Sequence, residues 1–132
     1  MRVSMILRLL AVAGCAMAMT PAAQAQGLFG DALTGKKLAA AIKKADAEPL
    51  GSEKNPVRVS MPAGQRAYLS RLRCANGSRP AFERGGSTGI GPFGNILDVY
   101  GVRCAGAEEV SIYMDMYHAE AETRAVPGFT IE

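Results

Sequence analysis

Two aspartates and the only histidine are the residues that could carry out chemistry. Asp98 and Asp115 each lie within an otherwise apolar run, and His118 follows Asp115 by three positions. Two carboxylates that converge in a pocket could act as general acid and general base in a hydrolysis, with the imidazole assisting. If the backbone stays extended, His118, Glu120 and Glu122 share one face and could bind a metal ion. These residues define the enzymatic alternative.

A structural role accounts for the same residues more simply. A carboxylate within a strand commonly points outward and pairs with a basic residue on the neighbouring strand, here Arg71, Arg73 or Arg103. The Ala-Glu-Ala-Glu run after His118 has low strand propensity, so it does not supply the fixed geometry of a metal site. No serine lies in a nucleophile-elbow context. We therefore predict no catalytic set, no metal and no cofactor.

Residues 1–25 predict a signal peptide rather than part of the fold. Arg2 and Arg8 precede an apolar run that is shorter than the roughly 20 residues needed to span a bilayer. The small-x-small pattern that ends at Ala25 predicts cleavage after that residue. Alternatively, the residues before Cys15 resemble a lipobox, in which Cys15 would carry a lipid. Both interpretations place the protein outside the cytoplasm, periplasmic or secreted, without a transmembrane span.

Cys74 and Cys104 remain after the leader is removed. An even pair of cysteines in an oxidising compartment predicts one disulfide. A metal pair or a catalytic thiol is the alternative, but neither cysteine lies in a C-x-x-C motif. Closing a loop of about 30 residues should stabilise the fold by about 3 to 4 kcal/mol.

Positive charge is concentrated in the middle of the chain. Residues 57–104 carry seven arginines against two acids, whereas residues 105–132 carry one arginine against six acids. The two segments could pair within one fold, or the arginines could form a face for an anionic component of the envelope or another protein. Arg71, Arg73 and Arg84 are the candidate binding residues. Nucleic acid is not expected as a partner of an exported protein.

Gly89, Gly91 and Gly94 match the G-x-G-x-x-G motif of a dinucleotide-binding turn. That motif works only where the glycines join a strand to a helix, whose first amides then hold the pyrophosphate. Here Pro92 interrupts the motif, and strand-forming residues follow it. We therefore expect the glycine-rich run 85–94 to be a mobile loop between strands, which could cover a binding site.

A helix and a β body are expected to position these residues. Thr34 can cap a helix from about Gly35 to Ala47, which opens the segment 26–49 and places its lysines opposite a short apolar stripe. Residues 50–132 then form a disulfide-tied β domain, with Pro62–Gly64 as a turn. Its expected strands are Val57–Met61, Ala67–Cys74, Ala81–Glu83, Ile96–Cys104, Val110–His118 and Phe129–Ile131. The fold class is mainly β with an N-terminal helix, as an antiparallel sheet or small sandwich.

Four stretches of the chain resemble a group of small exported bacterial proteins that carry no assigned function. They are Asn55-Pro56-Val57-Arg58, Tyr68 to Cys74, Asp98-Val99-Tyr100 before Cys104, and Met114-Asp115-Met116-Tyr117-His118. The resemblance supports the domain boundaries and the cysteine pairing, and it implies no catalytic residues. The size and the cysteine pair also invite comparison with periplasmic lysozyme inhibitors, although the characteristic loop motif of those proteins is not found here.

These observations predict a single exported domain that works as a binding or interaction module at the cell envelope. Its contact surface would comprise Arg71, Arg73, Arg84 and the run 85–94, and its partner would be an envelope protein or an anionic envelope component. The alternatives are a small-ligand carrier, an inhibitor-like periplasmic protein, and the hydrolase described above. The sequence sets no oligomeric state.

Overall fold

A computed structural model describes residues 31–132, so the expected cleavage site after Ala25 and the lipobox cysteine Cys15 lie outside the described residues. Two helices and six strands follow one another along the described chain. In order they are α1 (Gly35–Ala45), β1 (Val57–Arg58), α2 (Met61–Arg71), β2 (Leu72–Arg73), β3 (Ala81–Ile90), β4 (Ile96–Arg103), β5 (Val110–Asp115) and β6 (Thr130–Ile131).

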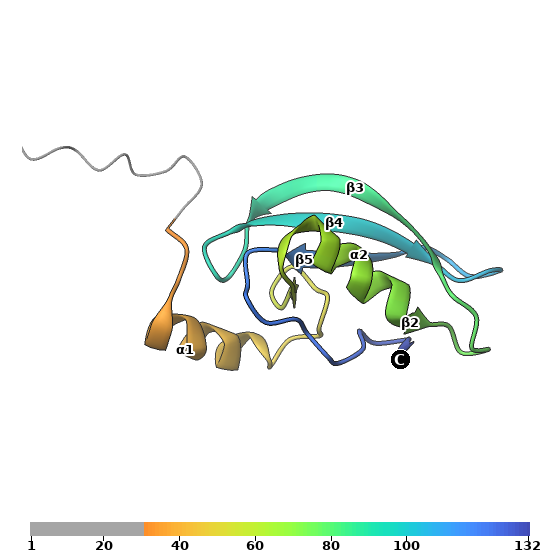
Figure 1. The fold of residues 1–132 in the computed structure, drawn as a ribbon, viewed down its shortest axis with the longest axis horizontal. Helices are drawn as coiled ribbons and strands as arrows, with labels where there is room; N and C mark the ends of the chain where they lie inside the picture. The colour runs from red at the N-terminus through yellow and green to blue at the C-terminus, as the bar shows by residue number, and fades with distance from the viewer. Residues whose placement is uncertain (1–30) are drawn as a thin grey trace, which may run out of the picture.

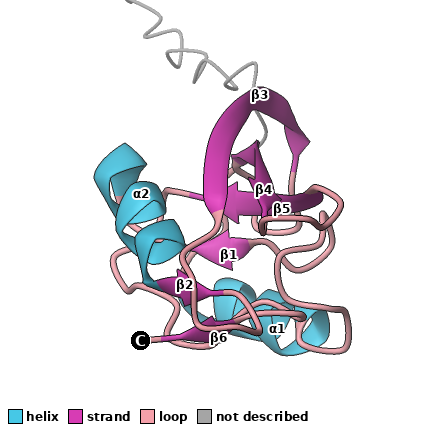
Figure 2. Ribbon diagram, turned by 90° about the vertical axis from the view of Figure 1, so that its right-hand side faces the viewer, coloured by secondary structure: helices cyan, strands magenta, loops and turns pink. Residues whose placement is uncertain are grey.

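The strands form one four-stranded sheet and one short ribbon. The sheet has the order β1-β5-β4-β3, in which β3, β4 and β5 pair antiparallel and β1 pairs parallel with β5. The ribbon pairs β2 antiparallel with β6. Figures 1 and 2 show α2 along one face of the sheet, while α1 lies to one side of it. The prediction of a mainly β, largely antiparallel fold preceded by a helix is confirmed.

The core lies between the sheet and α2. Along β4, Asp98, Tyr100 and Val102 are all buried and share one face, as the period of a strand requires. Met114 lies opposite Asp98, and Ile112 lies opposite Tyr100, so β5 continues the same face. The buried core comprises Val57, Val59, Tyr68, Leu69, Leu72, Tyr100, Val102, Ile112, Met114 and Val126.

The prediction of a turn at Pro62–Gly64 followed by a strand Ala67–Cys74 is wrong, because residues Met61–Arg71 form α2. Tyr68 and Leu72 are four residues apart, a spacing that suits both a helix face and one side of a strand. The burial of Gln65 and Leu69 completes the helical pattern, since residues three and four apart share a helix face. Pro62 lies in the first turn of α2, where its missing amide proton costs nothing.

The disulfide between Cys74 and Cys104 is confirmed, and it joins positions 30 residues apart. It links the residue after β2 to the residue after β4, so the loop that it closes contains the whole hairpin of β3 and β4.

The expectation of a loop over residues 85–94 is wrong for its first part. β3 continues to Ile90, far beyond the expected end at Glu83, and stays paired with β4 up to Ile90 opposite Ile96. Two register shifts accommodate the glycines, because bulges bend an antiparallel strand without ending it. Only residues 91–95 form the turn between β3 and β4.

We predict that Gly94→Ala destabilises the protein by about 2 kcal/mol, which lowers Tm by about 10 °C. Gly94 has a φ of +84°, and an added Cβ would overlap the carbonyl oxygen of Asp31. Gly89→Ala is the matched control, because no atom lies within 4 Å of its Cβ position. Thermal unfolding followed by circular dichroism compares the two variants. Equal Tm values would contradict the close approach of Asp31 to the turn.

Candidate functional site

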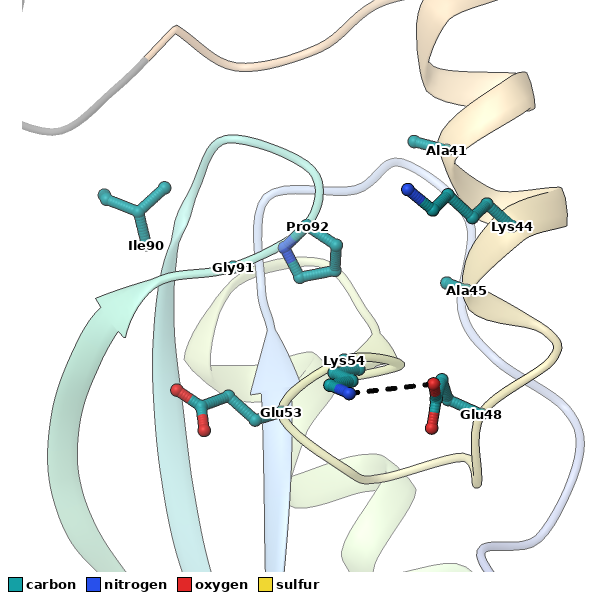
Figure 3. A pocket seen from close by; sticks show the side chains of 9 residues that line it. All are labelled: Ala41, Lys44, Ala45, Glu48, Glu53, Lys54, Ile90, Gly91 and Pro92. Carbon is teal, nitrogen blue, oxygen red and sulfur yellow. Dashed lines mark ion pairs between the residues drawn. The ribbon is translucent and has the colours of Figure 1, made fainter.

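A cavity of about 780 Å³ opens between α1 and the turn that joins β3 to β4 (Figure 3). Its volume falls within the range of about 300 to 1,000 Å³ that is usual for small-molecule sites. Three walls line it, formed by α1, by the segment 48–54, and by the end of β3 with the turn that follows it. The lining residues are Ala41, Lys44, Ala45, Glu48, Glu53, Lys54, Ile90, Gly91 and Pro92.

Two charged side chains of the cavity have no ionic partner. Lys44 and Glu53 form no ion pair within residues 31–132. Both side chains are exposed to water. Lys54 lies 3.8 Å from Glu48, in an exposed pair that contributes little to stability. Figure 3 shows Lys44 extending from α1 toward Pro92, with Glu53 across the cavity. Besides the Glu48–Lys54 pair, the cavity therefore offers one positive and one negative charge to a ligand.

Backbone contacts hold the walls of the cavity in place. The amide of Leu33, just before α1, donates to the carbonyl of Phe93 in the turn at 2.9 Å. The side chain of Asn55 donates to the carbonyl of Glu48 at 2.9 Å, which anchors the segment 48–54. Gly91 admits no side chain, because a Cβ there would lie 2.5 Å from Cδ2 of Leu97. The turn therefore packs closely on β4 and keeps its place beside α1.

The sequence did not predict this cavity. The run 85–94, which was expected to be a loop that could cover a binding site, contributes Ile90, Gly91 and Pro92 to the lining. Lys44 and Glu53 were not singled out, because nothing in the sequence brings α1 and the segment 48–54 to the same place. The position of Lys44 on the lysine-rich side of α1 was the only available signal.

Asp98 forms a buried network under α2. Its carboxylate accepts hydrogen bonds from Gln65 at 3.0 Å, Arg84 at 2.7 Å and Ser87 at 3.0 Å. Tyr100 donates in turn to Gln65 at 3.1 Å. Burial raises the pKa of Asp98, but the three hydrogen bonds and the charge of Arg84 outweigh it, so the pKa is lowered. The prediction that the Asp98 carboxylate points outward is wrong, because the side chain is buried. Its basic partner is Arg84 rather than Arg71, Arg73 or Arg103.

Asp115 is fully buried on the other face of the sheet, which corrects the expectation of an exposed side chain there too. Asn95 donates to both carboxylate oxygens, at 3.2 and 3.0 Å, and the amide of Tyr117 donates at 3.1 Å. Nε2 of His118 lies 3.1 Å from the carboxylate without a well-directed hydrogen bond. His118 also packs edge-on against Phe93, with 5.4 Å between ring centres. The cluster holds the β3–β4 turn against the end of β5.

The two aspartates therefore do not converge. Asp98 lies on the face of the sheet that α2 covers, whereas Asp115 lies on the opposite face with His118. Neither the cavity beside α1 nor a smaller one of about 220 Å³ on the β3–β4 hairpin is lined by any of the three residues. Their hydrogen bonds give them structural roles that the apolar pattern of the strands did not reveal.

Glu122 is also used within the fold rather than for a metal. Arg124 donates to it at 2.9 and 3.0 Å, and Arg58 donates at 3.3 Å. Hydrogen bonds from Arg124 lower the pKa of Glu122 to about 2, against a smaller rise from burial. Arg124 also reaches Asp46 at 3.2 Å, just after α1. In residues 31–132 no three acidic, histidine or cysteine side chains gather as metal ligands, and Glu120 takes no part in this network.

The candidate arginines divide between two places. Arg71 donates to the carbonyl of Glu132, and Arg73 pairs with the Glu132 carboxylate at 2.6 Å, with 11% of its side chain exposed. Arg84 pairs with Asp98, and about half of its side chain is exposed. Three arginines pair with the acidic C-terminal segment, as one of the two alternatives predicted: Arg58 with Glu122, Arg73 with Glu132 and Arg103 with Glu109.

No protein-family model, curated protein sequence or solved structure matches this chain. Within residues 31–132, no helix has the length and apolar character needed to cross a membrane.

We predict that Glu122→Gln lowers the free energy of unfolding at pH 7 by an amount on the order of 2 kcal/mol. The pKa of Glu122 is depressed in the fold from its ordinary 4.5 to about 2. Its stabilising effect is therefore complete above about pH 4.5 and is lost as the pH falls toward 2. Urea unfolding at several pH values should show the difference between variant and wild type shrinking over that interval.

Glu120→Gln is the control, because Glu120 is exposed and forms no ion pair within the described chain. It should leave the free energy of unfolding unchanged at both ends of the pH range. A Glu122→Gln effect that is the same at pH 7 and pH 2.5 would refute the assigned role of this carboxylate.

Proposed function

We propose that this protein is an exported, non-enzymatic binding module of the cell envelope, and that it binds its ligand or partner in the cavity beside α1. The observation that carries the proposal is a cavity of ligand size in which Lys44 and Glu53 have no ionic partner within the described residues. The buried carboxylates Asp98, Asp115 and Glu122, in contrast, are held by hydrogen bonds inside the fold. The leader sequence and the disulfide support a periplasmic or secreted location.

The chemistry of the cavity favours binding over catalysis. Its lining side chains include no histidine, cysteine, serine or threonine. Its ionisable groups are two lysines and two glutamates, all exposed to water, so none has the desolvated setting that activates a nucleophile or a general base. The carboxylates of Asp98 and Asp115 are held by hydrogen bonds on opposite faces of the sheet. The hydrolase alternative would instead need Asp98 and Asp115 to be directed into one pocket.

The arginine surface is a second candidate contact region for an anionic partner. Arg84 is the strongest of its members, because about half of its side chain stays exposed while Asp98 holds the guanidinium in place. Arg73 is largely buried against Glu132, which leaves it little surface to offer. We therefore rank the arginine surface second to the cavity as a candidate contact site.

We expect that protein purified from its own host retains a bound molecule, and that Lys44→Glu abolishes the retention. Reversing the charge on the wall of the cavity removes the group that would hold an anionic part of the ligand. Native mass spectrometry measures the retained mass directly. Lys36→Glu is the matched control, because Lys36 is exposed on the same helix and does not line the cavity.

The expected result is loss of the bound mass in Lys44→Glu and its retention in Lys36→Glu. A bound mass that both variants keep would place the ligand elsewhere. If Arg84→Glu removed the bound mass and Lys44→Glu did not, the arginine surface would replace the cavity as the assigned binding site.

A further inference from the structure

We infer that the cavity beside α1 selects a short peptide segment that carries one acidic and one basic group with small apolar residues between them. This inference rests on the proposed function of the cavity, and it names the chemistry of the ligand. The acidic group would pair with Lys44, and the basic group would pair with Glu53.

The arrangement of charges supports a ligand of mixed charge. Lys44 and Glu53 come from different walls of the cavity and form no ion pair with each other (Figure 3). A purely anionic ligand would meet Lys44 but would be repelled by Glu48 and Glu53. A purely cationic ligand would be repelled by Lys44 and Lys54. Only a ligand with both charges can match the two walls at once.

The uncharged part of the lining supports apolar contacts with small groups. Ala41 and Ala45 line the helix side, and Ile90 and Pro92 line the side of the turn. Ile90 is 46% exposed, which leaves apolar area for a ligand to cover. Short aliphatic side chains of a peptide would fill the space between the charged walls.

The same lining argues against sugars and nucleotides. None of its side chains is aromatic, so neither a sugar ring nor a base finds a stacking surface. The amide of Gly91 donates to Asn95 and its carbonyl accepts from Gly94, at 2.8 and 3.1 Å, so these groups of the wall already have partners. A ligand rich in hydroxyl groups would find few partners beyond the four charged side chains. A peptide needs only its two charges and its apolar part to be matched.

The test uses four blocked tetrapeptides and the mature disulfide-bonded protein. Their sequences are Glu-Ala-Ala-Lys, Glu-Ala-Ala-Gln, Gln-Ala-Ala-Lys and Gln-Ala-Ala-Gln, each acetylated and amidated so that only side chains carry charge. Titrations followed by ¹⁵N–¹H spectra report both the affinity and the place of binding. We expect Glu-Ala-Ala-Lys to bind at least about tenfold more tightly than the other three and to shift the amides of Ala41 and Gly91.

Reversing the charges of the two cavity residues tests the assigned pairing more directly. Lys44→Glu and Glu53→Lys should each weaken binding of Glu-Ala-Ala-Lys by about tenfold or more. The double variant Lys44→Glu with Glu53→Lys should regain binding, because the peptide can then lie in the reverse direction. Lys36→Glu should bind as the wild type does. Circular dichroism checks that every variant is folded, and exposed positions such as these are tolerant of substitution.

The outcomes separate this inference from the proposed function. If Glu-Ala-Ala-Gln binds as tightly as Glu-Ala-Ala-Lys, the site selects anions and the inference fails. If no peptide binds but Lys44→Glu loses the mass retained from the host, the inference also fails while the cavity keeps its function. If no peptide binds and no retained mass depends on Lys44, both are wrong.

Discussion

The buried carboxylate of Asp98 is the constraint on which the arrangement of helix and sheet depends. A charge removed from water is costly unless hydrogen bonds and an opposite charge replace its hydration. Here the replacements come from two elements, Gln65 of α2 and Arg84 and Ser87 of β3. Sliding α2 by one residue, or shifting β3 along β4, would break at least one of these bonds. The network therefore specifies how the pieces fit, whereas the apolar core supplies most of the driving force.

The uneven distribution of charge along the sequence reflects ion pairs between segments that are far apart in the chain. The C-terminal acids bond to arginines that lie far away in the chain, such as Glu122 with Arg58 and Glu132 with Arg73. Arg124 extends this pairing to Asp46 beside α1. Several exposed charges form no ion pair within residues 31–132, and those that line the cavity are distinguished by their concave position. Lys44 on α1 is the clearest of these.

Strands with a regular alternation and the start of α1 were predictable from the sequence, although the expected capping hydrogen bond from the Thr34 side chain is not formed. β4, β5 and α1 begin where they were expected, and Cys74 pairs with Cys104. α2 was missed because a four-residue spacing of apolar side chains suits both periods, and only the burial of Gln65 and Leu69 distinguishes them. Alternation also gives the face of a residue but not its neighbour across the fold, so the partners of Asp98 and Asp115 were not predictable. The cavity combines three segments that are separate in sequence, which no local pattern can reveal.

The position of the disulfide around the β3–β4 hairpin has a consequence for the order of events during folding. In the oxidised chain, the ends of this hairpin stay close before any other structure forms, which lowers the entropy lost when its strands meet. β1 must instead find β5 across more than fifty residues, Val57 opposite Met114. Oxidation thus favours a sequence in which the hairpin is the early template and the parallel edge strand joins last. A reduced chain would lose this entropic advantage and expose its apolar faces for longer.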